Sequence, residues 1–188
     1  MNRAIREAEQ DRAGICLLLR ESGGEVYQRH RFTIGVYALS RSSIGGENIF
    51  SYEFDSIGYC GPEDDVLISD IHSLARPFIS PTKSNPGTPP NFILIDGKLG
   101  MDDKLWRIGQ GYIEKTRAQH PGDRTTHTLL RLLKRGEELA KGFEKELSER
   151  QLMFMRRVAE KLGDNDVKAT HLLEEYCQGW CEWAAKRI

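Results

Sequence analysis

The sequence predicts an α+β or α/β fold, with a small mixed β-sheet in the N-terminal half and a helical hairpin or bundle in the C-terminal half. Apolar residues alternate with period two after residue 31, which is typical of strands. The unbroken apolar run at 92–95 favours a strand buried on both faces. From about residue 102 onwards, only helical spacing is visible. We therefore expect an α/β domain over residues 1–122 and a helical region over 123–188, packed on the first part or on a partner.

Composition excludes some classes of protein. The 188 residues carry a formal net charge of -1, which is not typical of a strongly basic nucleic-acid binder. No stretch approaches the roughly 20 apolar residues of a membrane helix, and the first 14 residues are too charged for a signal peptide. We expect a cytoplasmic protein with no membrane attachment. Its cysteines are then expected to be buried thiols: Cys16, Cys60, Cys177 and Cys181.

The first two elements are expected to be a helix and a hairpin. A helical apolar stripe covers residues 2–21, and Gly23-Gly24 ends it. The alternating segment that follows predicts a strand, and Gly45-Gly46 supplies the turn to a returning strand. Residues 30–58 are therefore predicted to form a β-hairpin.

A helix, a loop and a strand complete the predicted N-terminal half. "GPEDD" starts a helix, because Pro62 and the acidic residues suit its first turn, and an apolar face extends to Phe78. Residues 80–90 are a proline-rich loop. The strand "NFILID" then delivers Asp96, Gly97 and Lys98 into a turn.

Helices are expected throughout the C-terminal half. One covers residues 102–119, and the break at 120–123 separates it from a long apolar stripe over 129–162. This stripe is either one rod or two helices, with Ser148 as the cap and Gln151 as its capping-box partner. A last helix is expected from residue 167 to residue 183.

The order of hairpin, acidic helix start, proline-rich loop and strand resembles the ribonuclease-H-like endonucleases. More narrowly, it is similar to the nuclease half of the bacterial excision-repair endonuclease and, less closely, to endonuclease V. The resemblance covers residues 32–100. It is carried by Gly61 with Asp64-Asp65, and then by "ILIDGK" at 93–98 with Gly100. It implies a nucleic-acid-processing domain in which Mg²⁺ or Mn²⁺ activates water and stabilises the charge that builds on phosphate.

The resemblance also implies site residues. Asp96 would be the main metal ligand and Lys98 would lie near the phosphate. The family places a metal-binding aspartate on its first strand, and "FTIGVYALSRS" contains none. Asp55 or Glu53 on the second strand would take its place, so the expected catalytic residues are Asp96, Lys98 and Asp55 and the expected metal ligands are Asp96, Asp55 and Glu53.

Two other interpretations of the same strand remain open. Asp96 and Lys98 also match the acidic-x-lysine element of restriction-type nucleases, whose other carboxylate would come from Asp55, Asp65 or Asp70. Alternatively, Asp96-Gly97 is a plain turn after a core strand, with Lys98 in solvent.

Two further groups have a possible role in binding. Cys177 and Cys181 share one face of the last helix and would bind zinc with His171, although buried packing is the favoured interpretation because a structural zinc site needs four ligands. Residues 29–31, "RHR", either contact a nucleic-acid backbone or mark an exposed strand entrance.

The second functional hypothesis is a non-catalytic interaction, adaptor or inhibitor protein. Its helical half would bind a macromolecular partner, or a second copy of the chain, through residues 129–183. The near-neutral charge and the missing first-strand aspartate favour it. This hypothesis requires an exposed apolar face along the helices, whereas the nuclease requires three carboxylates close to Asp96.

Overall fold

The computed structural model describes residues 3–41, 48–54, 56–58, 61–75, 111–119 and 126–177. The helices in these ranges are α1 (Arg3–Glu21), α2 (Arg29–Ser40), α4 (Asp65–Ala75), α5 (Lys134–Glu144), α6 (Glu149–Gly163) and α7 (Ala169–Tyr176). The strands are β1 (Glu25–Tyr27), β2 (Ser56–Gly58), β3 (Gly61–Glu63), β4 (Ile113–Gln119) and β5 (Thr126–Leu132). The predicted α+β class is confirmed.

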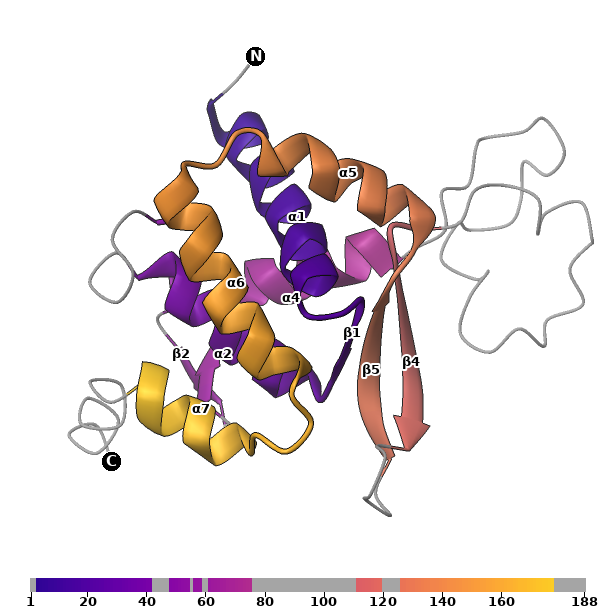
Figure 1. Cartoon of the computed structure of the whole chain (residues 1–188), viewed down its shortest axis with the longest axis vertical. Helices are drawn as coiled ribbons and strands as arrows, with labels where there is room; N and C mark the ends of the chain where they lie inside the picture. The colour runs from indigo at the N-terminus through magenta and orange to yellow at the C-terminus, as the bar shows by residue number, and fades with distance from the viewer. Residues whose placement is uncertain are drawn as a thin grey trace, which may run out of the picture.

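The larger sheet joins distant parts of the chain. Its strand order is β1-β5-β4, with antiparallel pairing, and β2 and β3 form a separate antiparallel pair. Val26, Leu130 and Lys115 lie side by side in the register, and Val26 and Leu130 are buried. The β4–β5 hairpin projects from the helices (Figure 1). The connection between these strands contains residue 122, where the sequence placed a domain boundary.

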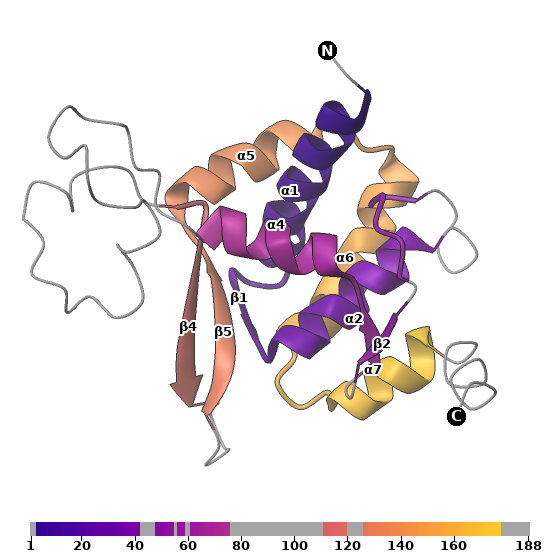
Figure 2. The same cartoon turned by 180° about the vertical axis from the view of Figure 1, so that it is seen from behind.

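Helix α2 is the centre of the fold, and the β-hairpin predicted over residues 30–58 is wrong at this point. Every residue from Arg31 to Ser40 is buried, and α2 lies against α6 and α7 (Figure 2). A helix that is buried on all sides has no polar face, so its sequence lacks the helical period. Gly35 allows α6 to approach, because a Cβ there would lie 2.6 Å from Leu162 Cδ1.

Two predicted helical segments are strands. Residues 113–119 form β4 rather than the end of a helix over 102–119, and residues 126–132 form β5 rather than the start of the long helical stripe. Leu129 and Leu130 have helical spacing only relative to the leucines that follow them in the sequence. In the structure, β5 pairs with β4 along its whole length and with β1 over residues 129–131. This pairing decides the conformation of β5.

The alternative of two separate helices is confirmed for the rest of the stripe. Ser148 caps α6: its Oγ accepts a hydrogen bond from Gln151 N at 3.3 Å, and Gln151 Oε1 accepts one from Ser148 N at 2.9 Å. Helix α5 packs on α1, and α6 packs on both α1 and α2 (Figure 1).

Two predicted helices in the N-terminal half are also present, but the predicted start of the second, with Pro62 in its first turn, is wrong because Gly61–Glu63 form β3. Helix α1 ends before Gly23 and Gly24, which both have φ of 86°. Helix α4 begins after Asp64, whose Oδ1 accepts a hydrogen bond from Leu67 N at 2.7 Å. The predicted strand at 91–96 lies outside the described residues. Within the described ranges, no helix has the length and apolar character needed to cross a membrane.

Candidate functional site: a polar cleft at the start of α2

Most of the predicted metal site lies outside the described residues, namely Asp96, Lys98 and Asp55. Glu53 is exposed in the irregular segment 48–54, so its predicted place on a second strand is wrong. That strand was expected to pair with residues 30–40, which form α2 instead. In the part of the chain that the structure describes, no group of three or more His, Cys, Asp or Glu side chains is arranged to hold a metal ion.

Of the other two acidic candidates, Asp65 is exposed at the start of α4, whereas Asp70 belongs to a buried network. Asp70 accepts hydrogen bonds from Arg12 Nε at 2.7 Å and from the Tyr52 hydroxyl at 2.9 Å. Burial raises the pKa of Tyr52, and the nearby carboxylates of Asp70, Asp11 and Asp64 raise it further. The tyrosine therefore stays protonated and continues to donate to Asp70. These contacts hold α1, α4 and the segment 48–54 together, which is a structural role.

Of the proposed zinc ligands, Cys177 is buried and His171 is exposed on α7. Cys181 lies outside the described residues. Cys16 is buried as well, so the expectation of buried thiols is confirmed for Cys16 and Cys177.

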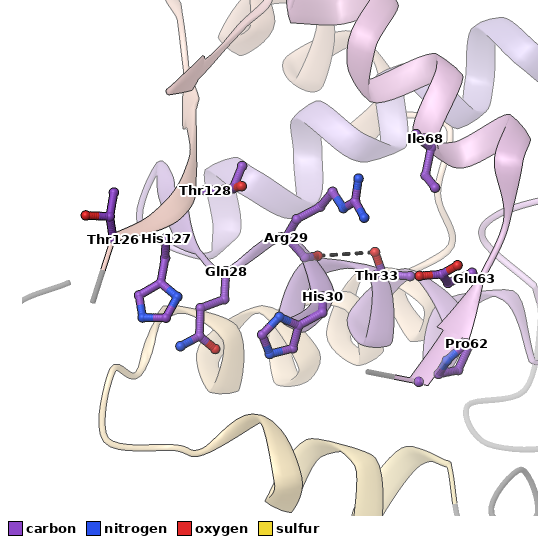
Figure 3. Close-up of a pocket in the computed structure, with 11 residues that line it drawn as sticks. Gln28, Arg29, His30, Thr33, Pro62, Glu63, Ile68, Thr126, His127 and Thr128 are labelled. Carbon is purple, nitrogen blue, oxygen red and sulfur yellow. Dashed lines mark hydrogen bonds between the residues drawn. The ribbon is translucent and has the colours of Figure 1, made fainter. Parts of the chain in front are cut away.

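A cleft of about 430 Å³ lies between the start of α2, β3, α4 and the start of β5 (Figure 3). Its lining is mostly polar and comes from segments that are far apart in the sequence. The lining residues are Gln28, Arg29, His30, Thr33, Gly61, Pro62, Glu63, Ile68, Thr126, His127 and Thr128.

Backbone contacts hold the two main walls of the cleft together. Gln28 has φ of 66°, and this sharp turn redirects the chain from β1 into α2. Gln28 N donates to Thr128 O at 2.8 Å, which joins the start of α2 to β5. Thr33 Oγ1 donates to Arg29 O at 3.2 Å and supports the first turn of the helix (Figure 3).

The cleft carries positive charge. The guanidinium of Arg29 is half-buried and makes no hydrogen bond or ion pair with any other residue that the structure describes. Burial and the charge of Arg29 lower the pKa of nearby Lys115, whose Nζ lies 3.0 Å from His72 Nε2. Among the described residues that line the cleft, Glu63 is the one acidic residue. An anion would therefore gain favourable contacts here.

Two histidines line the same cleft from different elements. The side chains of His30, from α2, and His127, from β5, lie beside Gln28 (Figure 3). Burial lowers the pKa of His30, and the nearby His127, Arg31 and Arg29 lower it further. His30 is therefore neutral at pH 7 and can accept a proton.

Sequence reasoning located only one side of this site. Residues 29–31 were considered for nucleic-acid contacts; Arg29 and His30 line the cleft, whereas Arg31 is buried against α6. The alternative of a strand entrance is wrong because these residues begin α2. His127 has no local signal that connects it with His30. Only the pairing of β1 with β5 brings the two close together.

Searches of protein-family models, of curated proteins and of solved structures found no match to this chain. The resemblance to ribonuclease-H-like endonucleases therefore stays a prediction from residues 32–100.

Proposed function

We propose that this protein is a nucleic-acid-processing domain, and that the cleft at the start of α2 binds the phosphodiester backbone. The observation that carries this proposal is the unpaired, half-buried guanidinium of Arg29 among the described residues. Arginine in such a setting is a strong partner for phosphate oxygens. Lys115 adds a second cation close to Arg29.

The arrangement suits a chain-like ligand better than an isolated ion. Figure 3 shows that Arg29 extends towards Ile68, whereas His30 and His127 lie on the other side of the first turn of α2. Successive phosphates of one strand can contact both groups. The attraction is local, since the net charge of the chain is -1. Binding should therefore depend on a small number of cationic contacts.

Metal-dependent hydrolysis through Asp96, Asp55 or Glu53, with Lys98 near the phosphate, stays a prediction. The test is to measure cleavage of DNA and RNA in the presence of Mg²⁺ or Mn²⁺, and to compare the wild-type protein with Asp96→Ala. Loss of metal-dependent cleavage in the variant would support Asp96 as a ligand. This assay does not test the cleft, so metal-dependent hydrolysis and phosphate binding in the cleft can be tested separately.

The competing hypothesis of an interaction protein needs an exposed apolar face along residues 129–183. Across the described part of that region, Met153 is the only large apolar side chain that is exposed. Helices α5, α6 and α7 instead direct their apolar residues onto α1 and α2. This packing favours the cleft over the helical face as the site of function.

The test is fluorescence anisotropy with labelled single-stranded RNA and DNA oligonucleotides. Arg29→Gln should weaken binding about tenfold, the equivalent of about 1.4 kcal/mol, and reduce the salt dependence by about one phosphate contact. Arg150→Gln removes an exposed arginine at the start of α6 and serves as the matched control. Absence of binding by folded wild type, or equal effects of the two substitutions, would overturn the proposal.

A further inference from the structure

His30 and His127 are held at a defined separation by the backbone. His30 lies two residues after Gln28, and His127 directly precedes Thr128; the hydrogen bond from Gln28 N to Thr128 O at 2.8 Å ties these two points together. Both rings lie on the same side of the cleft (Figure 3). Two titratable groups that flank one site can divide the roles of base and acid.

Several charged or titratable groups surround His30. His30 is affected by Arg29 and Arg31 from its own helix and by His127 from β5, and Glu63 of β3 lines the same cleft. The Arg31 guanidinium donates to carbonyls at the end of α6, so Arg29 is the arginine that lines the cleft. The result is a neutral imidazole on α2 near a fixed cation, which suits proton acceptance next to a bound phosphate.

The described residues give this pair of histidines no third metal ligand. A zinc site needs at least three protein ligands. No such group is present in the described ranges, and Glu63 does not complete one with the two histidines. Two imidazoles that line one cleft can supply proton transfer.

We propose that His30 and His127 act as the general base and the general acid in a metal-independent cleavage of RNA, an inference that rests on the proposed function. Neutral His30 takes the proton of a ribose 2′-hydroxyl, and the 2′-oxygen forms a bond to the adjacent phosphorus. The bond from phosphorus to the 5′-oxygen breaks, and protonated His127 gives its proton to that oxygen. The products are a 2′,3′-cyclic phosphate and a 5′-hydroxyl, with no change in oxidation state.

Arg29 has a supporting role in this step. Because Arg29 extends towards Ile68, on the other side of the first turn of α2 from the two histidines, its guanidinium would hold the neighbouring phosphate of the strand while the fifth bond forms. The exchange of protons leaves His30 charged and His127 neutral, and solvent restores the starting states. The substrate must be RNA, because DNA lacks the attacking hydroxyl.

The experiment uses an end-labelled RNA oligonucleotide in excess EDTA, with a matched oligonucleotide that has 2′-deoxyribose throughout. Wild type should cleave the RNA, leave the DNA intact and produce a cyclic phosphate that mass spectrometry identifies. His30→Gln and His127→Gln should each be at least about 100-fold slower. His171→Gln, which changes an exposed histidine on α7, should cleave at the wild-type rate.

The pH–rate profile of wild type adds a readout that needs no variant. It should be bell-shaped, since one imidazole must be neutral and the other protonated. A flat profile, cleavage of the deoxy substrate, or undiminished cleavage by His30→Gln or His127→Gln would overturn the inference. Circular dichroism and thermal unfolding establish that each variant is folded.

The outcome also separates this inference from the proposed function. Wild type that binds the oligonucleotide in the anisotropy assay but does not cleave it in EDTA would overturn the acid–base pair and leave the binding cleft intact. Cleavage that requires Mg²⁺ and is lost in Asp96→Ala would overturn the metal-independent step. Absence of binding would overturn both proposals.

Discussion

Arg31 closes the C-terminal end of α6 from within α2. Its Nη2 donates hydrogen bonds to the backbone carbonyls of Asp164 at 2.8 Å and Lys161 at 3.1 Å, and the residue is only 2% exposed. The last carbonyls of a helix lack partners within the helix and carry partial negative charge. The Arg31 guanidinium therefore provides hydrogen bonds to the last carbonyls of α6. It also fixes α6 against α2, the helix that carries Arg29 and His30 at the cleft.

Replacing Arg31 with Met should destabilise the fold by about 3 kcal/mol, because two charge-assisted hydrogen bonds are lost and two carbonyls at the end of α6 lose their donor. The free energy of unfolding in urea measures the change. Arg156→Met, which alters an arginine more than half exposed on α6, should cost no more than about 1 kcal/mol. Equal losses of unfolding free energy in the two variants would show that the buried Arg31 contacts stabilise the fold no more than an exposed arginine does.

Asp11 should make stability depend on pH. Burial raises the pKa of its carboxyl above the usual 3.8; hydrogen bonds from Ser51 lower it in part, and the neighbouring Asp70 and Glu7 raise it. The folded state therefore holds this proton more tightly than the unfolded state. The contribution of Asp11 to stability is then largest at low pH and is lost as pH rises through the raised pKa.

The pH effect can be isolated with Asp11→Asn, which cannot titrate. The stability difference between wild type and this variant should shift in favour of wild type as pH falls from 7 towards 4. Asp166→Asn, at an exposed position, should show no such trend. Urea unfolding at several pH values gives the comparison, and a trend of the opposite sign for Asp11→Asn would contradict the assignment.

The thiol of Cys16 should be unreactive in the folded protein. It is 0% exposed, and burial raises its pKa to about 12, so almost no thiolate forms at pH 8. Iodoacetamide should modify Cys16 only when the chain unfolds, with a rate that increases with urea. Peptide mass spectrometry follows this residue separately from the other cysteines. Rapid labelling in buffer alone would mean that α1 opens readily.

Two glycines in α5 should respond to alanine in opposite directions. A Cβ at Gly136 would lie 2.3 Å from the backbone oxygen of Tyr112, whereas a Cβ at Gly142 meets nothing within 4 Å. Gly136→Ala should therefore destabilise the protein by about 1–3 kcal/mol. Gly142→Ala should stabilise it by about 0.5–1 kcal/mol, since alanine restricts the unfolded chain.

Thermal and urea unfolding of both glycine variants provide the measurement, and each variant controls for the other because they lie on one helix. Gly136 is close to Tyr112, where the chain enters β4. A neutral Gly136→Ala would show that α5 can move away from this strand at little cost.

Local chemistry made some elements predictable from sequence. Helix α1 shows a regular apolar stripe and ends at two glycines, and the capping box of Ser148 and Gln151 marks the start of α6. These signals depend on residues within a few positions of one another. The predicted helix ends were correct because backbone geometry and nearby side chains determine them, independently of the rest of the fold.

The tertiary structure decided the rest. Residues 32–38 alternate in a way that suggests a strand, yet they belong to a helix that is buried from Arg31 to Ser40, and β5 became a strand through its pairing with β1 and β4. The cleft depends on the same long-range contacts, because Gln28 and Thr128 must meet before His30 and His127 can share a site. The sequence by itself determined which segments can be helical and where several of them begin and end. Burial and strand pairing between distant segments decided which residues lie together in the fold. Both depend on contacts with residues far away in the sequence, which local sequence patterns do not contain.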